Sequence, residues 1–264
     1  MLIVGERINA SRKAVRAALE QMDAGTIQAE AAAQAQAGAH YIDVNGGTFP
    51  GREPELLAWL VDTVQQATDR PLCLDSSDPA ALAAALRRVQ RPAPMLNSIT
   101  LEGARFERML PLAREFRTKV VALCQGEGVA TTAQQKVDTA SRLVERLAGA
   151  GVALDDIYVD PLVFPLATDT GAGTAALEAF REIALRFPGV HTICGLTNVS
   201  HGLPARKLIN RAFLVSALGA GLDAAILDPT DRELMAALHA AQAVLGRDEY
   251  CLGYLKAFRA GKLA

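Results

Sequence analysis

Several side chains that could bind or convert a ligand stand at the ends of short apolar runs in this 264-residue sequence. They are mostly carboxylates and amides, which offer hydrogen-bond acceptors and donors but few of the usual catalytic bases. A carboxylate can accept two parallel N–H bonds from a 2-amino-pyrimidinone edge, much as it accepts a guanidinium. The residues of this kind are Glu6, Asn9, Asp43, Asn45, Asp75, Asn97, Asp160, Asn198 and Asp228.

One of these residues, Asn198, lies in the segment CGLTNVSHGLP at 194–204. A short apolar run ends there at Gly195, and a small polar loop follows. Catalytic loops more often present a carboxylate, a histidine or a thiol, because those groups accept or deliver protons. The amide of Asn198 does neither, so its role depends on where the fold places this loop.

Eight short apolar runs alternate with longer helical patterns along the whole chain, which is the order expected of βα units. The stretches 53–69, 133–150 and 231–246 carry apolar residues at three- and four-residue spacing and predict helices. No linker rich in glycine, serine or proline separates the two halves. The predicted strands are LIV (2–4), YIDV (41–44), LCLD (72–75), MLN (95–97), KVVAL (119–123), IYVD (157–160), HTICGL (191–196) and AAILD (224–228).

This repeat predicts a closed (β/α)₈ TIM barrel, formed by a single domain that spans residues 1–264. Parallel strands that are buried on both faces read as continuous apolar runs, as these do. The alternative is a doubly wound open sheet, which would usually use fewer strands, and no G-x-G-x-x-G follows the first run. In a barrel the active site lies at the C-terminal ends of the strands, where the polar residues stand.

Helix capping is the alternative role for polar residues at strand ends, and it is weak for several of them. Asp78 precedes a proline and is a better helix cap than Asp75. The helical pattern that follows Asp160 begins too late in the sequence for Asp160 to cap it. Asp228 lies within capping reach of the last helix, so we assign it a structural role. The remaining carboxylates and amides predict a shared pocket.

A flat, neutral heterocycle rich in N–H donors suits separated carboxylates and amides, and a pterin fits that description. A two-metal hydrolase would also use carboxylates, but it typically needs several histidines near them. Only His201 of the four histidines lies in a loop after a predicted strand, so we expect no bound metal. Scaffold or surface roles are expected for His40, His191 and His239.

Composition and charge argue against other classes of function. The net charge is −2 with mixed signs along the chain, so nothing indicates a nucleic-acid or membrane-surface partner. The sequence has no apolar run of the roughly 18 residues needed for a membrane span and no signal peptide, and we expect a cytoplasmic protein. No zinc site or disulfide framework is predicted, since the cysteines are scattered. Three of them fall in apolar runs where buried, inert thiols are expected: Cys73, Cys124 and Cys194.

Eight motifs occur in order over nearly the whole chain. They are MLIVGERINAS (1–11), DVNGG (43–47), LCLDSS (72–77), NS (97–98), YVDPL (158–162), GLTNVS (195–200), ARKLINRAFL (205–214) and GLDAAI (221–226). This set resembles the pterin-binding methyltransferases, above all the methyltetrahydrofolate:corrinoid/iron–sulfur protein methyltransferase family. The folate domain of cobalamin-dependent methionine synthase and dihydropteroate synthase are similar at a greater distance.

The resemblance implies a TIM barrel, usually a homodimer, that binds 5-methyltetrahydrofolate as its substrate. It further implies transfer of the N5 methyl group to the cobalt(I) of a cobalamin-type corrinoid. The chain has no D-x-H-x-x-G stretch of the kind that presents a histidine to cobalamin, so the corrinoid is expected on a separate protein. The direction of transfer, and the choice between tetrahydrofolate and a related pterin, remain open.

Matched motif by motif, the resemblance implies that Asp75, Asn97 and Asp160 hold the pterin ring. Asn198 would face N5 and serve as the catalytic residue, because an amide can donate to neutral N5 or accept from protonated N5. Arg206 would flank the p-aminobenzoate part of the folate. The other site residues that we assign are Gly195, Asp43 and His201.

The chain departs from the family at two places beside this site. His201 and Gly202 replace an amide-bearing stretch, and Cys124 and Gln125 follow the fifth strand. Both places could touch the methyl donor or the incoming corrinoid. Two other functions stay open: a dihydropteroate synthase-like enzyme, although residues 43–52 lack a D-V-G-G-E-S-T-R-P loop, and a non-catalytic pterin-binding or docking subunit.

Overall fold

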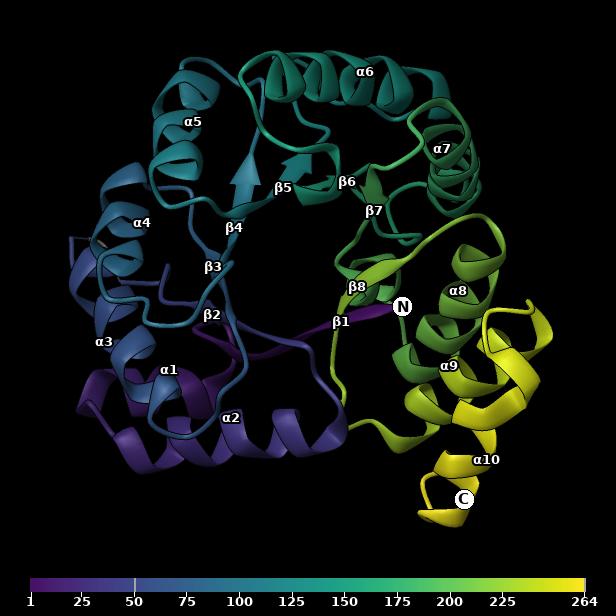
Figure 1. Ribbon diagram of the computed structural model, residues 1–264, viewed down its shortest axis with the longest axis horizontal. Helices are drawn as coiled ribbons and strands as arrows, with labels where there is room; N and C mark the ends of the chain where they lie inside the picture. The colour runs from purple at the N-terminus through teal and green to yellow at the C-terminus, as the bar shows by residue number, and fades with distance from the viewer. Residues whose placement is uncertain (50, 264) are drawn as a thin grey trace.

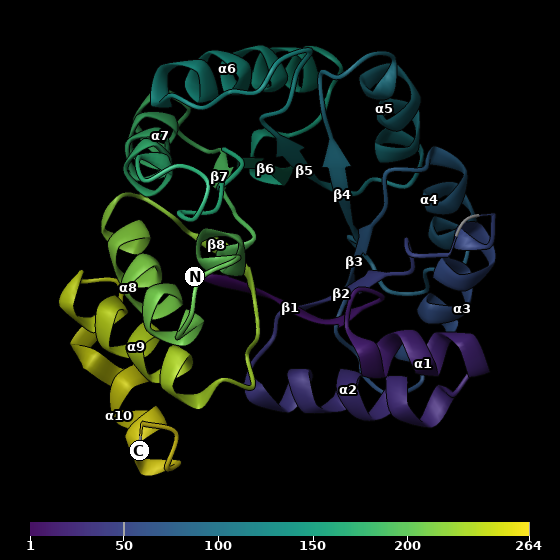
Figure 2. The same ribbon diagram turned by 180° about the vertical axis from the view of Figure 1, so that it is seen from behind.

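The eight predicted strands form one parallel sheet in the computed structural model, which describes residues 1–49 and 51–263. The sheet order is β7-β6-β5-β4-β3-β2-β1-β8, so neighbours in the chain are neighbours in the sheet and β8 lies beside β1. This is the predicted (β/α)₈ barrel, with its helices arranged around the strands (Figures 1 and 2). The strands are β1 (Leu2–Asn9), β2 (Tyr41–Asn45), β3 (Leu72–Asp75), β4 (Met95–Ile99), β5 (Lys119–Leu123), β6 (Ile157–Asp160), β7 (His191–Thr192) and β8 (Ala224–Leu227).

The helices follow the strands as the periodicity predicts. The three helices predicted at 53–69, 133–150 and 231–246 are present, and each ends slightly earlier than predicted. The α-helices are α1 (Lys13–Gln21), α2 (Ala24–Ala37), α3 (Glu53–Gln65), α4 (Pro79–Leu86), α5 (Arg105–Glu115), α6 (Ala133–Gly149), α7 (Ala172–Arg186), α8 (Arg206–Gly219), α9 (Arg232–Val244) and α10 (Leu252–Arg259). Short 3₁₀ helices are η1 (Leu154–Asp156), η2 (Leu196–Ser200) and η3 (Glu249–Cys251).

The barrel closes between the segment after β7 and strand β8. Regular pairing of β7 ends at Thr192, so the strand predicted at 191–196 is too long. The chain remains bonded to its neighbour beyond that point, because the Ile226 N–H donates to the Cys194 carbonyl at 2.9 Å. Gly195 then forms an isolated parallel bridge with Ile226. After this bridge the backbone coils into η2, which carries the polar loop toward the strand ends.

The apolar side chains of the strands divide between two faces. Those that face outward join the helices in a large buried core around residues such as Leu56, Leu60 and Leu143. Those that face inward fill the barrel, as expected for a packed core rather than a pore. The interior residues are Val4, Tyr41, Cys73, Met95, Val121, Tyr158, Ile193 and Ala224.

Side-chain caps fix where several helices begin. Asp78 caps α4 as predicted and accepts a bond from the Ala80 N–H at 2.8 Å. Thr132 and Gln135 form a reciprocal capping box at the start of α6. Asp231 caps α9, so the helix predicted at 231–246 does not need Asp228 as its cap. These caps satisfy backbone N–H groups in the first turns of the three helices.

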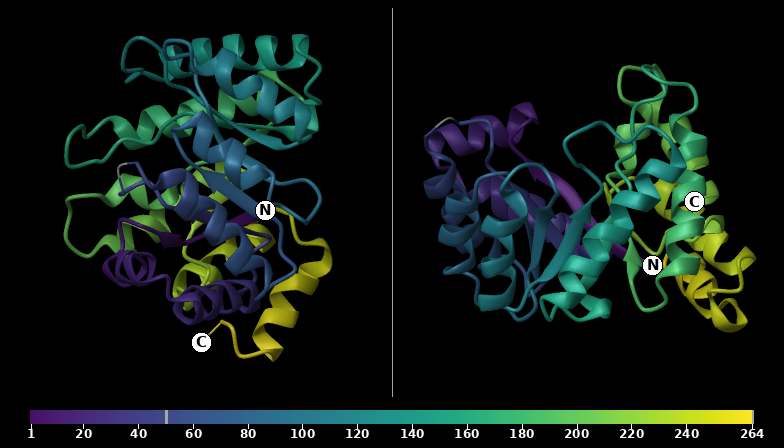
Figure 3. Two further views of the ribbon diagram at one scale, coloured as in Figure 1. Left: turned by 90° about the vertical axis from the view of Figure 1, so that its left-hand side faces the viewer. Right: turned by 90° about the horizontal axis from the view of Figure 1, so that it is seen from above.

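The C-terminal helix α10, yellow in Figures 1 and 3, lies on the outer side of the barrel beside α9. Among the helices of residues 1–49 and 51–263, none is both long and apolar enough to cross a bilayer.

Candidate active site

Strand alternation extends the inward-facing rows from the apolar interior to a polar layer at the C-terminal ends. Side chains two positions apart on a strand share a face. Members of the interior cluster on five strands are Val4, Tyr41, Cys73, Met95 and Tyr158. The residues two positions beyond them are Glu6, Asp43, Asp75, Asn97 and Asp160. This end of the barrel is therefore lined by carboxylates and one amide from five strands, and we call it the mouth.

Asp75, at the end of β3, is held between neighbouring strands. The Asn45 side-chain N–H donates to Asp75 Oδ2 at 2.8 Å, and Asp75 pairs in register with Asn97 on β4. Burial raises the pKa of Asp75; the bond from Asn45 opposes this rise and the charge of Glu53 adds to it. The carboxyl is thus fixed in position while its environment favours the protonated form.

Asp43 lies one layer deeper in the mouth and is only 2% exposed. Burial raises its pKa well above the ordinary value, and the nearby charge of Asp75 raises it further. Within the described ranges 1–49 and 51–263, Asp43 Oδ1 has no hydrogen-bond partner. A buried oxygen without a partner costs free energy, so this position also favours the neutral acid.

Asp160, at the end of β6, is 7% exposed and accepts a bond from the Leu162 N–H at 2.7 Å. Burial raises the pKa of Asp160 to about 6, against the opposing effects of the Leu162 N–H and of the Lys136 charge. The bond from Leu162 shows how the loop after β6 fixes this carboxylate. The pKa of Asp160 lies close enough to neutrality for a bound ligand to change the charge of Asp160.

Lys136 on α6 bonds the loop that follows β6. We did not identify this lysine from the sequence. Its side chain is 1% exposed, and Nζ donates to the carbonyls of Pro161 and Leu162 at 2.8 and 2.7 Å. Burial lowers its pKa. The sequence contains a sign of this role, because Lys136 stands next to Val137 on the apolar face of an amphipathic helix. A lysine is rarely buried there without a partner.

Asn198 lies exposed in η2, with its turn braced by α8. Arg206 Nη2 donates to the Thr197 carbonyl at 2.8 Å, and Nε donates to Ser200 Oγ at 3.0 Å. Gly195 gives the amide its space, because a methyl group on Gly195 would lie 3.0 Å from Asn198 Nδ2. From the sequence we assign Arg206 to contact with the folate. Its guanidinium also fixes the loop that contains Asn198.

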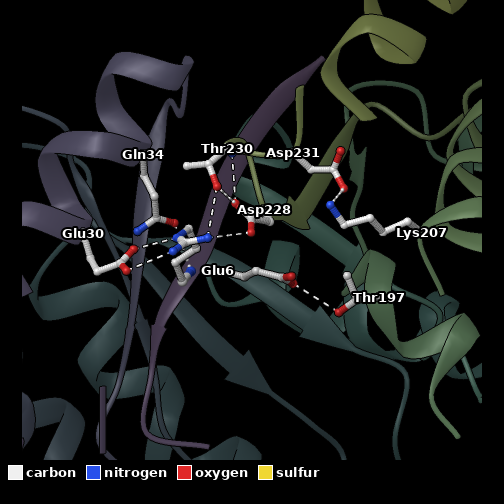
Figure 4. Close-up of polar contacts among 9 residues, drawn as sticks. Glu6, Glu30, Gln34, Thr197, Lys207, Asp228, Thr230 and Asp231 are labelled. Carbon is white, nitrogen blue, oxygen red and sulfur yellow. Dashed lines mark hydrogen bonds and ion pairs between the residues drawn. The ribbon is translucent and has the colours of Figure 1, made fainter. Parts of the chain in front are cut away.

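Glu6 on β1 contacts the same loop across β8, the strand that lies between β1 and the segment after β7. The Thr197 hydroxyl donates to Glu6 Oε2 at 3.2 Å, and Figure 4 shows the carboxyl extending toward Thr197. Burial raises the pKa of Glu6 to about 7, with a further contribution from the charge of Asp228. Sequence reasoning placed Glu6 at a strand end without assigning it to the site, although the alternation Leu2, Val4, Glu6 already predicted that it faces inward.

The next residue of β1 faces the other way and belongs to a structural ion-pair cluster. Arg7 donates to both oxygens of Glu30 at 2.6 and 2.9 Å, and to Asp228 at 2.9 Å. Thr230 bonds both Arg7 and Asp228, and Figure 4 shows this cluster on the far side of Glu6 from Thr197. Asp228 is therefore engaged as a structural group between β1 and β8.

His201 and the cysteines differ in their exposure. His201 is exposed just after η2, and its backbone N–H donates to the Asn198 carbonyl at 3.1 Å. Cys124 is buried, its backbone N–H donates to the Asp160 carbonyl at 2.8 Å, and burial raises the pKa of its thiol. Cys73 and Cys194 are also buried, as predicted, whereas Cys251 is exposed.

Comparison with known proteins gives relatives along the whole chain. The sequence profile of the family described as "Pterin binding enzyme" matches residues 5–228. The methylcorrinoid:tetrahydrofolate methyltransferase of Eubacterium limosum is 39% identical over 269 residues, covering 100% of this chain and 98% of that protein. The methionine synthase of Mycobacterium tuberculosis is 35% identical over 242 residues, covering 86% of this chain but 20% of that longer protein.

Solved structures share the same architecture. Dihydropteroate synthase from Xanthomonas albilineans, in complex with 7,8-dihydropteroate, superposes with a TM-score of 0.71 over 92% of this chain and 93% of that one. A Yersinia pestis dihydropteroate synthase superposes with a TM-score of 0.70 over 93% of each chain. Both are 18% identical to this sequence, so the likeness is one of fold.

Proposed function

Because this chain belongs to the pterin-binding methyltransferases, we propose that it moves a methyl group between N5 of tetrahydrofolate and the cobalt of a corrinoid on a separate protein. The observation that carries this proposal is the 39% identity, over the full length, to the methylcorrinoid:tetrahydrofolate methyltransferase. The name of that relative favours delivery of the methyl group from the corrinoid to tetrahydrofolate. The same site would also support the reverse transfer.

In this proposal the pterin ring lies in the mouth against Asp75, Asn97 and Asp160, with Asp43 beneath it. Carboxylates that accept N–H bonds from the ring are favoured in their charged form. The raised pKa values of Asp75 and Asp160 in the absence of such donors fit this arrangement. Binding of the pterin is therefore expected to lower both pKa values.

We assign Asn198 to N5, and Arg206 and His201 to the rest of the substrates. N5 is a poor leaving group until it gains a proton or a strong hydrogen bond. An amide can donate through its NH₂ or accept through its oxygen, so Asn198 serves N5 before and after protonation. Gly195 gives this amide its space. Arg206 would flank the p-aminobenzoate part of the folate, and the exposed His201 would face the corrinoid partner.

The direct test is methyl transfer with free corrinoids in both directions. The purified protein is mixed with 5-methyltetrahydrofolate and Co(I) cobalamin, or with tetrahydrofolate and methylcobalamin, and the corrinoid spectrum is followed. We expect protein-dependent formation of methylcobalamin in the first mixture and its loss in the second. Tight folate binding without turnover in either mixture would instead identify a non-catalytic pterin-binding subunit.

A further inference from the structure

The proposed reaction exchanges one proton at N5, and the structure offers a carboxyl group beside Asn198 that is not used to hold the pterin. Asn198 itself has no proton to give at ordinary pH, since an amide does not titrate there. The proton must therefore come from, or go to, another group near the loop. Asp75 is held by Asn45 and Asp160 by the Leu162 N–H, and both are assigned to the ring.

Glu6 differs from these carboxyls in its contacts. Its Oε2 accepts one bond, from the hydroxyl of Thr197, the residue directly before Asn198. In the part of the chain that the structure describes, no protein hydrogen bond is made to Oε1. Because Glu6 follows Val4 on the inward face of β1, this oxygen belongs to the mouth rather than to the Arg7 cluster outside.

The charges that face Glu6 come from four directions. Asp228 on the β8 side raises its pKa, and Arg12 in the loop after β1 and Arg206 on α8 lower it. Asp43 on β2 is close enough for the charge of Glu6 to raise its own pKa. With burial as the largest cause, the pKa of Glu6 lies at about 7, where a carboxyl group can both give and take a proton.

We propose that Glu6 is the proton-exchanging group of the methyl-transfer site, acting on N5 beside Asn198. This inference rests on the proposed function. When the methyl group leaves folate, the electron pair of Co(I) forms the cobalt–carbon bond and cobalt becomes Co(III). The carbon–nitrogen pair stays on N5, which takes the proton of Glu6. In the reverse direction the cobalt–carbon pair stays on cobalt, the N5 lone pair takes the methyl group, and the Glu6 carboxylate removes the N5 proton.

The pH dependence of the two directions separates this role from a structural one. Transfer from 5-methyltetrahydrofolate needs protonated Glu6, so its single-turnover rate falls as pH rises through about 7. Transfer to tetrahydrofolate needs the carboxylate, so its rate rises over the same range. Glu6→Gln keeps the size of the side chain and an acceptor for Thr197 but cannot titrate. It is expected to lower both rates by about 10²-fold, the lower range for general acid–base catalysis, and to abolish the opposite slopes.

Two matched variants complete the experiment. Glu127→Gln removes an exposed carboxylate from the loop after β5 and is expected to keep the wild-type slopes. Thr197→Val removes the hydroxyl that bonds Glu6 but leaves the titrating group, so both slopes should persist. Calorimetry with 5-methyltetrahydrofolate should give Glu6→Gln the wild-type affinity, which excludes loss of the pocket as the cause.

The outcomes distinguish this inference from the proposed function. If the wild-type protein transfers methyl groups and Glu6→Gln retains both its rate and its opposite slopes, Glu6 is not the proton-exchanging group. If Glu6→Gln lowers both rates but keeps both slopes, Glu6 only positions the Asn198 loop and the inference is also wrong. A wild-type protein inactive in both directions would overturn the proposed function first.

Discussion

At the scale of single residues, the carboxylates that we assign to pterin binding differ in their contacts from Asn198. Asp75 accepts a bond from Asn45 on the neighbouring strand, and Asp160 accepts one from the Leu162 N–H of its own loop. Asn198 is different: it is exposed, and its side chain forms no hydrogen bond within residues 1–49 and 51–263. An amide with no protein hydrogen bonds can bond the ligand without breaking a contact, so little of the protein must rearrange when the ligand reacts.

Replacement of Asn198 by alanine therefore tests the chemistry alone. Asn198→Ala should leave the fold unchanged, because the exposed side chain supports no neighbour. The rate of methyl transfer should fall by roughly 10²–10³-fold, the usual effect of losing one positioned donor. Single-turnover kinetics at saturating folate measure this step. An unchanged rate would remove Asn198 from the mechanism.

Asp75→Ala, by contrast, should mainly weaken folate binding, which calorimetry measures.

At the scale of elements, the strands were predictable and the loop after β7 was not. The run HTICGL predicted a strand over 191–196, but regular pairing ends at Thr192. The apolar pattern is satisfied by burial of Ile193 and Cys194, and burial alone does not distinguish a strand from an irregular extended segment. After Gly195 the backbone turns into η2, and Arg206 fixes this turn through contacts that no local pattern shows.

The same limit applies to the site. Asp43, Asp75, Asn97 and Asp160 could be placed at the mouth because alternation and strand order determine which side chains share the barrel interior. Lys136 could not be found this way, since its partners are backbone carbonyls in a distant loop. The helical pattern shows that Lys136 is on the apolar face of α6, but it does not show which groups Lys136 bonds.

Gly195→Ala tests whether the turn controls the position of Asn198. The backbone angles of Gly195 suit any residue (φ −69, ψ 94), so the fold should persist. The added methyl group would lie 3.0 Å from Asn198 Nδ2 and must displace the amide. We expect methyl transfer to slow by ~10-fold or more, since small misplacements at a reacting centre are costly. Wild-type rates with unchanged folate affinity would show that the amide adjusts without loss.

At the scale of the whole molecule, the two ends of the barrel carry ionisable groups of different kinds. The mouth contains buried carboxyl groups with raised pKa values, including Glu6 and Asp160. At the opposite end, His191 bonds Asp223 at 2.7 Å and Asp155 at 3.1 Å. A raised pKa, for an acid or for a histidine, stabilises the folded state at lower pH. Glu6, Asp160 and His191 therefore each make the barrel less stable as pH rises through their pKa values.

The His191 contribution can be isolated by substitution. Burial alone would lower the pKa of His191, but the bonds to Asp223 and Asp155 outweigh it and raise the pKa. This stabilisation is complete below the unfolded-state value of about 6.5 and is lost as pH rises through the higher folded-state value. In urea unfolding, wild type should exceed His191→Gln in stability near pH 6 by more than near pH 9. A constant difference at both pH values would contradict the ion-pair interpretation.

In the mouth, the buried carboxyl group of Asp160 is expected to lower the stability of the folded state at high pH. The pKa of Asp160 rises from 3.8 to about 6, so ionising this buried carboxyl at pH 8 costs the folded state up to about 3 kcal/mol. Asp160→Asn keeps an oxygen that can accept the Leu162 N–H and removes the charge. We expect it to be more stable than wild type at pH 8 in urea unfolding, with the gain vanishing near pH 4, where both forms are neutral in the folded state. Asp138→Asn, an exposed position on α6, should show no such gain. If Asp160→Asn is no more stable than wild type at pH 8, the buried charge is already compensated, and the mouth is not held at a cost to the fold.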